Sequence, residues 1–134
     1  MKKTISIVSG TLNRKENVKR LVENTIEKYN FLELVLVDGG STDGTVEYIE
    51  SLNYDNLIFV NYGKRSSYPH FMNLGILNSS GEFICIWDDD AVLINSWTEV
   101  LTILDEQKYD FYIFNWKLGD DISSINNTEW IKGN

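Results

Sequence analysis

The chain has 134 residues, a length that corresponds to one domain with a buried core. Hydrophobic residues make up 43% and charged residues 24%, which are ordinary values for a soluble globular protein. The net charge of −8, without a basic stripe, argues against a nucleic-acid partner, because phosphate-backbone binding draws on clustered Lys and Arg. No apolar run approaches the roughly 18 residues that a membrane-spanning helix needs.

The chain contains one cysteine, Cys85, and so cannot form a disulfide within itself. This favours a reducing compartment, and we expect a cytoplasmic protein in which Cys85 packs as a small apolar group. The first eight residues faintly resemble a signal peptide, but Thr4 and Ser6 interrupt their apolar run. We therefore interpret this segment as part of a first strand.

Short apolar stretches suited to strands alternate along the chain with stretches whose apolar residues recur at helical spacing. In chain order, we expect a strand at 5–8, a helix at 18–29, a strand at 32–37, a helix at 46–52, a strand at 57–60, a helix at 70–77, a strand at 83–87, a helix at 97–104 and a strand at 111–116. This alternation predicts an α/β fold with a parallel sheet. Residues 1–134 are expected to form a single domain that ends in a polar tail, 117–134.

Two of the expected helices carry N-terminal capping patterns. Asn13 and Glu16 resemble a capping box ahead of the first helix, with Asn in place of Ser or Thr. Ser96 and Glu99 form a complete capping box ahead of the fourth helix. We therefore expect Asn13 and Ser96 to accept hydrogen bonds from the first backbone N–H groups of their helices.

The expected strand at 83–87 runs directly into three carboxylates, Asp88, Asp89 and Asp90. Its five apolar residues in a row predict a central strand that is covered on both faces. Adjacent carboxylates repel one another, and a divalent cation is the usual compensator, although a solvated acidic loop is the alternative. In an extended chain, Asp88 and Asp90 would point to one side and Asp89 away from it.

The expected strands end at Ser9, Asp38 and Asp88, which would lie along one edge of a parallel sheet, where a nucleotide could bind. The chain lacks the G-x-x-x-x-G-K-[ST] motif of a P-loop. The first turn, 9–14, has one glycine where a dinucleotide-binding fingerprint has three. A phospho-acceptor receiver domain would have an acidic pair after the first strand, where this chain has Ser9 and Gly10.

Three segments in order resemble the family 2 glycosyltransferases, which have the GT-A nucleotide-sugar fold. They are residues 7–14 (IVSGTLNR), 34–45 (LVLVDGGSTDGT), and 72–76 (MNLGI) with 81–90 (GEFICIWDDD). The second segment is the most specific, and the three together span about residues 5–116. The resemblance implies a Rossmann-like three-layer sandwich with a mostly parallel central sheet.

The same resemblance implies a site for a nucleotide-diphosphate sugar, with a UDP-sugar as the expected donor. Asp38 would accept a hydrogen bond from the imide of the uracil ring. Backbone groups around Thr11 and the side chain of Asn13 or Arg14 would line the base and the ribose. Asn73 would lie near the sugar diphosphate.

In the acidic motif, the resemblance makes Asp90 the direct metal ligand. Asp88 would contact the ribose or reach the metal through water, and Asp89 would belong to the nucleotide-sugar site. Mn²⁺ or Mg²⁺ would bridge these residues to the two phosphates and neutralise charge on the departing nucleoside diphosphate. Ala91 departs from many members of the family, which carry a further acidic residue at this position.

Two further polar residues are expected to be structural. Asp43 precedes an expected helix, where an Asp ordinarily acts as an N-cap. His70, the single histidine of the chain, is expected in a loop or at the surface rather than as a ligand.

The activity that the resemblance implies is metal-dependent, inverting transfer of the sugar to a saccharide or lipid-linked acceptor, as in polysaccharide biosynthesis. A lipid-linked acceptor would be compatible with peripheral membrane association. The transfer needs a base for the proton of the acceptor hydroxyl, and in the family this carboxylate lies well beyond the metal motif. Only 44 of the 134 residues follow Asp90. Asp120 and Asp121 are the candidates, although they come early in the chain for this role.

Two other functions remain open from the sequence. The chain could be a truncated, non-catalytic nucleotide-sugar-binding module, or one half of a split enzyme. A nucleotidyltransferase shares the sheet and an acidic metal site. It would have a glycine-rich basic loop after the first strand, where this chain offers Arg14 and Lys15.

Overall fold

The computed structural model describes residues 5–114 and 131–132. The chain forms two compact units, Met1–Leu101 and Thr102–Asn134. Within the described ranges, no helix is both long enough and apolar enough to cross a membrane. The residues expected at the polar tail, including Asp120 and Asp121, lie outside these ranges apart from 131–132.

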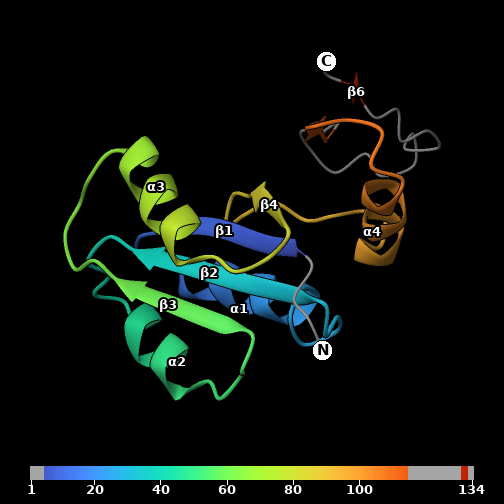
Figure 1. Ribbon diagram of the computed structural model, residues 1–134. Coiled ribbons are helices and arrows are strands. Elements are labelled where there is room, and N and C mark those ends of the chain that lie inside the picture. Colours follow the sequence, from blue (N-terminus) through green and yellow to red (C-terminus); the bar gives the residue numbers. More distant parts are fainter. Residues whose placement is uncertain (1–4, 115–130, 133–134) are drawn as a thin grey trace. The chain divides into compact units, whose positions relative to one another are not determined.

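Four parallel strands form a sheet in the first unit (Figure 1), in the order β3-β2-β1-β4. The strands are β1 (Ile5–Thr11), β2 (Leu32–Asp38), β3 (Leu57–Asn61) and β4 (Phe83–Ile86). In the register of the sheet, Ile7 of β1 pairs with Leu34 of β2 on one side and with Cys85 of β4 on the other. Helices separate consecutive strands along the chain, so the expected parallel α/β fold is confirmed.

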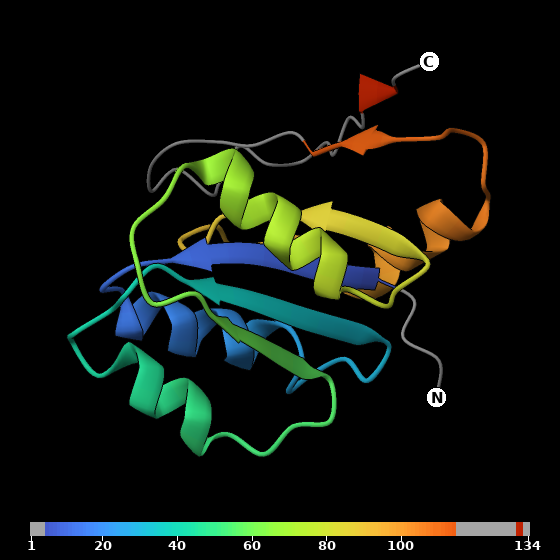
Figure 2. The ribbon, with the colours of Figure 1, turned by 60° about the vertical axis from the view of Figure 1, so that its left-hand side comes forward.

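Helices cover both faces of this sheet (Figure 2). They are α1 (Lys15–Asn24), α2 (Thr45–Ser51) and α3 (Tyr68–Asn78). α3 lies on one face, and α1 and α2 lie on the other. This is the three-layer arrangement that the family resemblance implies.

The core on the α3 face is formed by Val8, Val35 and Val37 of the two central strands and by Phe71 and Met72 of α3. α3 approaches the sheet closely at a glycine: a Cβ added to Gly75 would lie 2.2 Å from Cγ1 of Val8. Any larger residue would therefore push the helix away from β1. The glycine allows α3 to hold its first residue, Tyr68, near the carboxyl edge of the sheet.

The expectation that residues 83–87 form a central, doubly covered strand is wrong. β4 pairs with β1 and, within the described residues, with no second strand. Ile84 and Ile86 are 46% and 43% exposed, because α3 packs over β1, β2 and β3 rather than over β4. The fully buried strands are β1 and β2. An apolar run shows that neither face of a strand is polar, but it does not determine the number of neighbouring strands.

The expected fifth strand, 111–116, does not join the parallel sheet within the described residues. It is reduced to β5 (Tyr112–Ile113), which pairs antiparallel with β6 (Ile131–Lys132) in the second unit. The position of β5 is thus set by a partner in the polar tail, for which the sequence predicts no strand. The last helix, α4 (Trp97–Asp105), begins in the first unit and ends in the second.

The two capping predictions have opposite outcomes. At α4, Oγ of Ser96 accepts a hydrogen bond from the N–H of Glu99 at 3.2 Å, as expected. At α1, the expected box is wrong: Arg14 is the N-cap and makes no side-chain cap hydrogen bond. Asn13 has a left-handed backbone, with φ of +53°, which turns its side chain toward another loop instead.

Candidate functional site

Polar residues from three strand ends meet at the carboxyl edge of the sheet. Thr11 and Asp38 are the paired last residues of β1 and β2. The three carboxylates of the acidic turn, defined here as residues 88–90, follow β4. The carboxyl edge of an open α/β sheet is the usual place for a ligand. This edge is therefore the candidate site.

The chain bends at the acidic turn, where the N–H of Ala91 donates to the carbonyl oxygen of Asp88 at 3.1 Å. Asp88 and Asp90 are exposed, whereas Asp89 is only 8% exposed. Asp89 is thus the buried member of the turn. The extended geometry behind the expected alternation does not hold, because the chain bends here and Nη1 of Arg14 contacts both Asp89 and Asp90.

Asp89 fastens the acidic turn to β1. Oγ1 of Thr11 donates to Oδ2 of Asp89 at 2.9 Å, and Nη1 of Arg14 donates to Oδ1 at 3.3 Å. Burial raises the pKa of Asp89, and the negative charges of Asp90 and Asp88 raise it as well. The hydrogen bond from Thr11 and the positive charge of Arg14 lower it. Burial has the largest effect, so the net direction is upward.

The other two carboxylates also have neighbours from outside the turn. Nη1 of Arg14 lies 3.1 Å from Oδ2 of Asp90, which is 59% exposed. The side chain of Tyr68, at the start of α3, lies near Asp88. Burial, and then the charge of Asp88, raise the pKa of Tyr68. Arg14 is thus a resident positive charge in a site that the sequence predicts to be compensated by a metal.

Asp38 closes the turn that follows β2. Its carboxylate accepts hydrogen bonds from the N–H of Gly40 and of Ser41, each at 2.8 Å, and from the Ser41 hydroxyl. Gly40 has a φ of +94°, and a Cβ there would lie 3.0 Å from the carbonyl oxygen of Gly63. Glycine is therefore required at this turn. Asp38 is fully buried, so its expected contact with uracil stays a prediction.

Asn13 joins the loop after β1 to the loop after β2. Its Oδ1 accepts from the N–H of Thr42 at 2.7 Å, and its own N–H donates to Oγ of Ser41 at 2.8 Å. Asn13 lies beside the Asp38 turn, which is compatible with its expected role near a base or ribose.

Asp43 precedes the N-cap of α2, which is Gly44, so its expected place as the N-cap is wrong, although its side chain does bond to the first helical residue. Its Oδ1 accepts from the N–H and the hydroxyl of Thr45 at the start of α2, and its Oδ2 accepts from the N–H of Lys15 at the start of α1. The Thr45 hydroxyl is the main cause that lowers the pKa of Asp43. Asp43 therefore fixes the beginnings of two helices at the candidate site.

Two predicted positions in α3 are not part of this cluster. Asn73 is exposed and, in the described part of the chain, makes no hydrogen bond with the acidic turn. His70 is half-buried within the helix, with its ring edge-on to Tyr62 at 5.0 Å. The expectation of a loop or surface histidine is wrong, because α3 begins at Tyr68, two residues earlier.

Sequence reasoning missed Tyr68 and the main contact of Arg14. A helix start at Tyr68 has visible signals, since Ser67 accepts from the N–H of His70 and a proline occupies the first turn. Nothing local to residue 68 indicates that its side chain lies near Asp88. Arg14 was expected to line the base and ribose, whereas here it binds the acidic turn.

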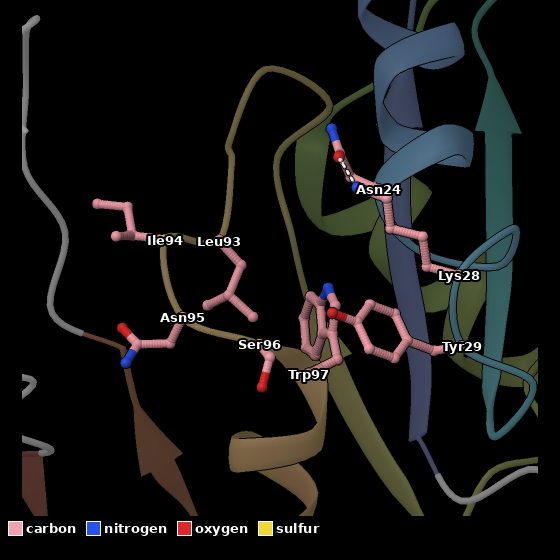
Figure 3. A pocket seen from close by; sticks show the side chains of 8 residues that line it. All are labelled: Asn24, Lys28, Tyr29, Leu93, Ile94, Asn95, Ser96 and Trp97. Carbon is pink, nitrogen blue, oxygen red and sulfur yellow. Dashed lines mark hydrogen bonds between the residues drawn. The ribbon is translucent and has the colours of Figure 1, made fainter.

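A hollow of about 290 Å³ lies away from the acidic turn, at the far end of α1 (Figure 3). Its lining comes from the end of α1 and the segment after it, and from the loop before α4: Asn24, Lys28, Tyr29, Leu93, Ile94, Asn95, Ser96 and Trp97. α1 starts beside Arg14 and ends at Asn24, a length of about 15 Å for ten residues. No acidic residue lines this hollow, so its chemistry differs from that of the acidic turn.

The exposed carboxylates of the acidic turn fit a hard divalent cation. Within the described ranges, no group of three His, Cys, Asp or Glu side chains is arranged around a metal position. Asp88 and Asp90 nevertheless supply oxygen donors on the exposed side of the turn. Mg²⁺ is characteristically bound by one or two carboxylates, with water and substrate phosphates as the other ligands. These two carboxylates therefore fit a divalent cation that takes its remaining ligands from a bound diphosphate and from water.

Comparison with known proteins identifies the family. A model of glycosyl transferase family 2 matches residues 6–130. The chain belongs to this family. It is 32% identical to the abequosyltransferase RfbV of Salmonella typhimurium and 29% identical to the glycosyltransferase GlyG of Streptococcus pneumoniae. These alignments cover 96% and 87% of this chain but 41% and 40% of the relatives, so the chain spans about two fifths of their length.

Solved structures of glycosyltransferases have a similar fold. TarS of S. aureus, residues 1–349 in complex with UDP, matches with a TM-score of 0.68 and 25% identity, over 80% of this chain and 33% of the 1–349 chain. The mannosyltransferase PcManGT of Pyrobaculum calidifontis, in complex with GDP-Man and Mn²⁺, matches with a TM-score of 0.63 and 25% identity, over 77% of this chain and 32% of the mannosyltransferase. The fold is that of the GT-A glycosyltransferases.

Proposed function

We propose that this chain binds a UDP-sugar together with Mn²⁺ or Mg²⁺ and serves the inverting transfer of the sugar to an acceptor hydroxyl. The observation that carries the proposal is the acidic turn, held at the carboxyl edge of the sheet by the hydrogen bond between Thr11 and Asp89. Family membership supports it, as do the nucleotide and metal bound by the two similar structures.

In this proposal, Asp90 and Asp88 would hold the cation, which would supply positive charge to offset that of the departing diphosphate. Asp89 keeps the turn in place through Thr11. Asp38 receives the uracil imide once Ser41 turns away, because the buried carboxylate is otherwise occupied by its own turn.

Thr11, Asn13 and Arg14 are proposed to line the nucleotide from the β1 side. Asn73 is proposed to approach the sugar diphosphate, which would extend the site along α3 toward the exposed face of the helix.

The group that takes the proton of the acceptor is proposed to lie outside the described residues. Asp120 and Asp121 are the candidates within the chain. The chain spans about two fifths of its relatives, which favours a second candidate function, a nucleotide-sugar-binding part that needs further residues for transfer. A cytoplasmic location, and a saccharide or lipid-linked acceptor at a membrane surface, complete the proposal.

Calorimetric titration with UDP, with and without Mn²⁺, tests the site. We expect Mn²⁺ to tighten UDP binding and Asp90→Asn to remove most of this gain. Asp55→Asn, an equal change at an exposed carboxylate before β3, is the matched control and should behave as the unchanged chain. A UDP affinity that is indifferent to Mn²⁺, or an equal loss in both variants, would refute the assignment.

A further inference from the structure

A single guanidinium nitrogen bridges two carboxylates of the acidic turn. Nη1 of Arg14 donates to Oδ1 of Asp89 at 3.3 Å and to Oδ2 of Asp90 at 3.1 Å. Its remaining guanidinium nitrogens make no hydrogen bond to any described residue. Arg14 thus places one positive charge on Asp90, the residue proposed above as the metal ligand, and keeps further donors unused.

The two carboxylates hold Arg14 unequally. Asp89 is 8% exposed and is also bound by Thr11, so its position is fixed by β1. Asp90 is 59% exposed, and no other described side chain bonds to it. A competing cation could therefore take Asp90 from Arg14, while Asp89 would keep the guanidinium beside the site.

A divalent cation on Asp90 and the guanidinium cannot share this carboxylate without cost. Both are positive, and Arg14 already makes a charge-assisted hydrogen bond to Asp90, at 3.1 Å. A diphosphate offers the displaced guanidinium an alternative partner, because the planar donors of arginine match phosphate oxygens.

We propose that Arg14 is an internal competitor of the divalent cation. In the nucleotide-free protein, Arg14 binds Asp90. When a nucleoside diphosphate binds, the guanidinium leaves Asp90 for the phosphate oxygens, so that metal and nucleotide bind cooperatively. This inference rests on the proposed function, since it takes Asp90 as the metal ligand. It assigns Arg14 a regulatory contact that family membership and the similar structures do not supply.

The test measures the affinity of the nucleotide-free chain for Mn²⁺. Electron paramagnetic resonance reports the concentration of unbound Mn²⁺ during the titration. Arg14→Met removes the charge and keeps an apolar stem. Arg20→Met makes the same change in net charge at an exposed position of α1 and is the matched control. We expect Arg14→Met to bind Mn²⁺ about tenfold more tightly than the unchanged chain and Arg20→Met to leave the affinity within about twofold, since about tenfold corresponds to one modest ionic interaction.

A second measurement separates competition from a positioning role. UDP affinity with and without Mn²⁺ gives the coupling between the two ligands, which we expect to fall in Arg14→Met. Adding Asp90→Asn to Arg14→Met should abolish the gain in Mn²⁺ affinity. Equal or weaker Mn²⁺ binding in Arg14→Met, with a thermal unfolding midpoint like that of the control, would overturn the inference.

The outcomes distinguish this inference from the proposed function. If Mn²⁺ tightens UDP binding through Asp90 but Arg14→Met behaves as Arg20→Met, only the competition is refuted. If the unchanged chain binds Mn²⁺ neither alone nor with UDP, the proposed function and this inference both fail.

Discussion

Asp43 illustrates how one exposed side chain can organise a ligand site. It accepts hydrogen bonds at the starts of both α1 and α2, and so fixes two loops that end beside the candidate site. Carboxylates are well suited to this position, because they accept N–H donors and interact favourably with the positive end of a helix dipole.

Replacement of Asp43 tests this role at the scale of a single residue. Asp43→Ala should lower the free energy of unfolding by about 1 kcal/mol at neutral pH, a value similar to that for loss of a side chain that bonds the first N–H groups of a helix. Since the pKa of Asp43 is lowered in the folded protein, its stabilising contribution is present above the ordinary Asp pKa of 3.8 and lost as pH falls through the folded pKa.

Urea unfolding at pH 7 and at successively lower pH below 3.8 measures the effect, with Asp55→Ala as the control. The difference between Asp43→Ala and the unchanged chain should shrink across the acidic series. A difference that stays constant below 3.8 would show that the charge of Asp43 is not involved.

At the scale of the element, β4 is the strand whose environment differs most from its sequence pattern. Ile84 and Ile86 face the same side as α3 but are nearly half exposed, whereas Leu34 of β2 is fully buried. The cost of truncating an apolar side chain depends on the apolar surface it buries and the cavity it leaves.

We therefore expect unequal costs for equal truncations. Leu34→Ala should destabilise the protein by about 2–5 kcal/mol, the range for large-to-small changes in a core, and Ile84→Ala by about 1 kcal/mol or less. Denaturant unfolding of both variants measures the difference. Equal costs would mean that Ile84 is covered in solution, by residues outside the described ranges or by another molecule.

The sequence predicts the order of strands and helices well, because periodicity and turn residues are local properties. The acidic turn at a strand end is likewise local, and its place at the carboxyl edge follows from a parallel sheet. The central position assigned to residues 83–87 could not be corrected from sequence, since it depends on which distant segments pair. The contact of Arg14 with Asp90 joins residues 76 positions apart, and Tyr68 lies near Asp88 only in the folded chain.

At the scale of the whole molecule, the chain contains a complete acidic turn but spans about two fifths of its relatives. The fold and the candidate metal ligands lie within residues 5–114. The base that a transfer requires is not assigned to any described residue. Nucleotide-sugar binding and sugar transfer therefore call for separate measurements.

We expect this chain alone to bind a UDP-sugar but to transfer the sugar slowly, because general base catalysis contributes typically about 10²–10⁴-fold. A product assay with a panel of UDP-sugars and sugar acceptors measures transfer, and hydrolysis to water can be followed in the same samples. Turnover near about 1–10³ s⁻¹, usual for enzymes, would show that the chain contains its own base. Asp120→Asn and Asp121→Asn would then identify it, with Asp55→Asn as the control.

The two hydrogen bonds of Asn13 have a consequence for how the carboxyl edge responds to a ligand. Its side-chain Oδ1 accepts from Thr42 and its backbone N–H donates to Ser41, so the loops after β1 and β2 are cross-linked although the bonded residues lie 29 and 28 positions apart. Opening one loop therefore breaks bonds of the other, and the amide protons of Asn13 and Thr42 should exchange with solvent in a single cooperative event. A base seated against the Asp38 turn would in this way slow the fluctuations of the β1 loop, including those of residues that it does not touch.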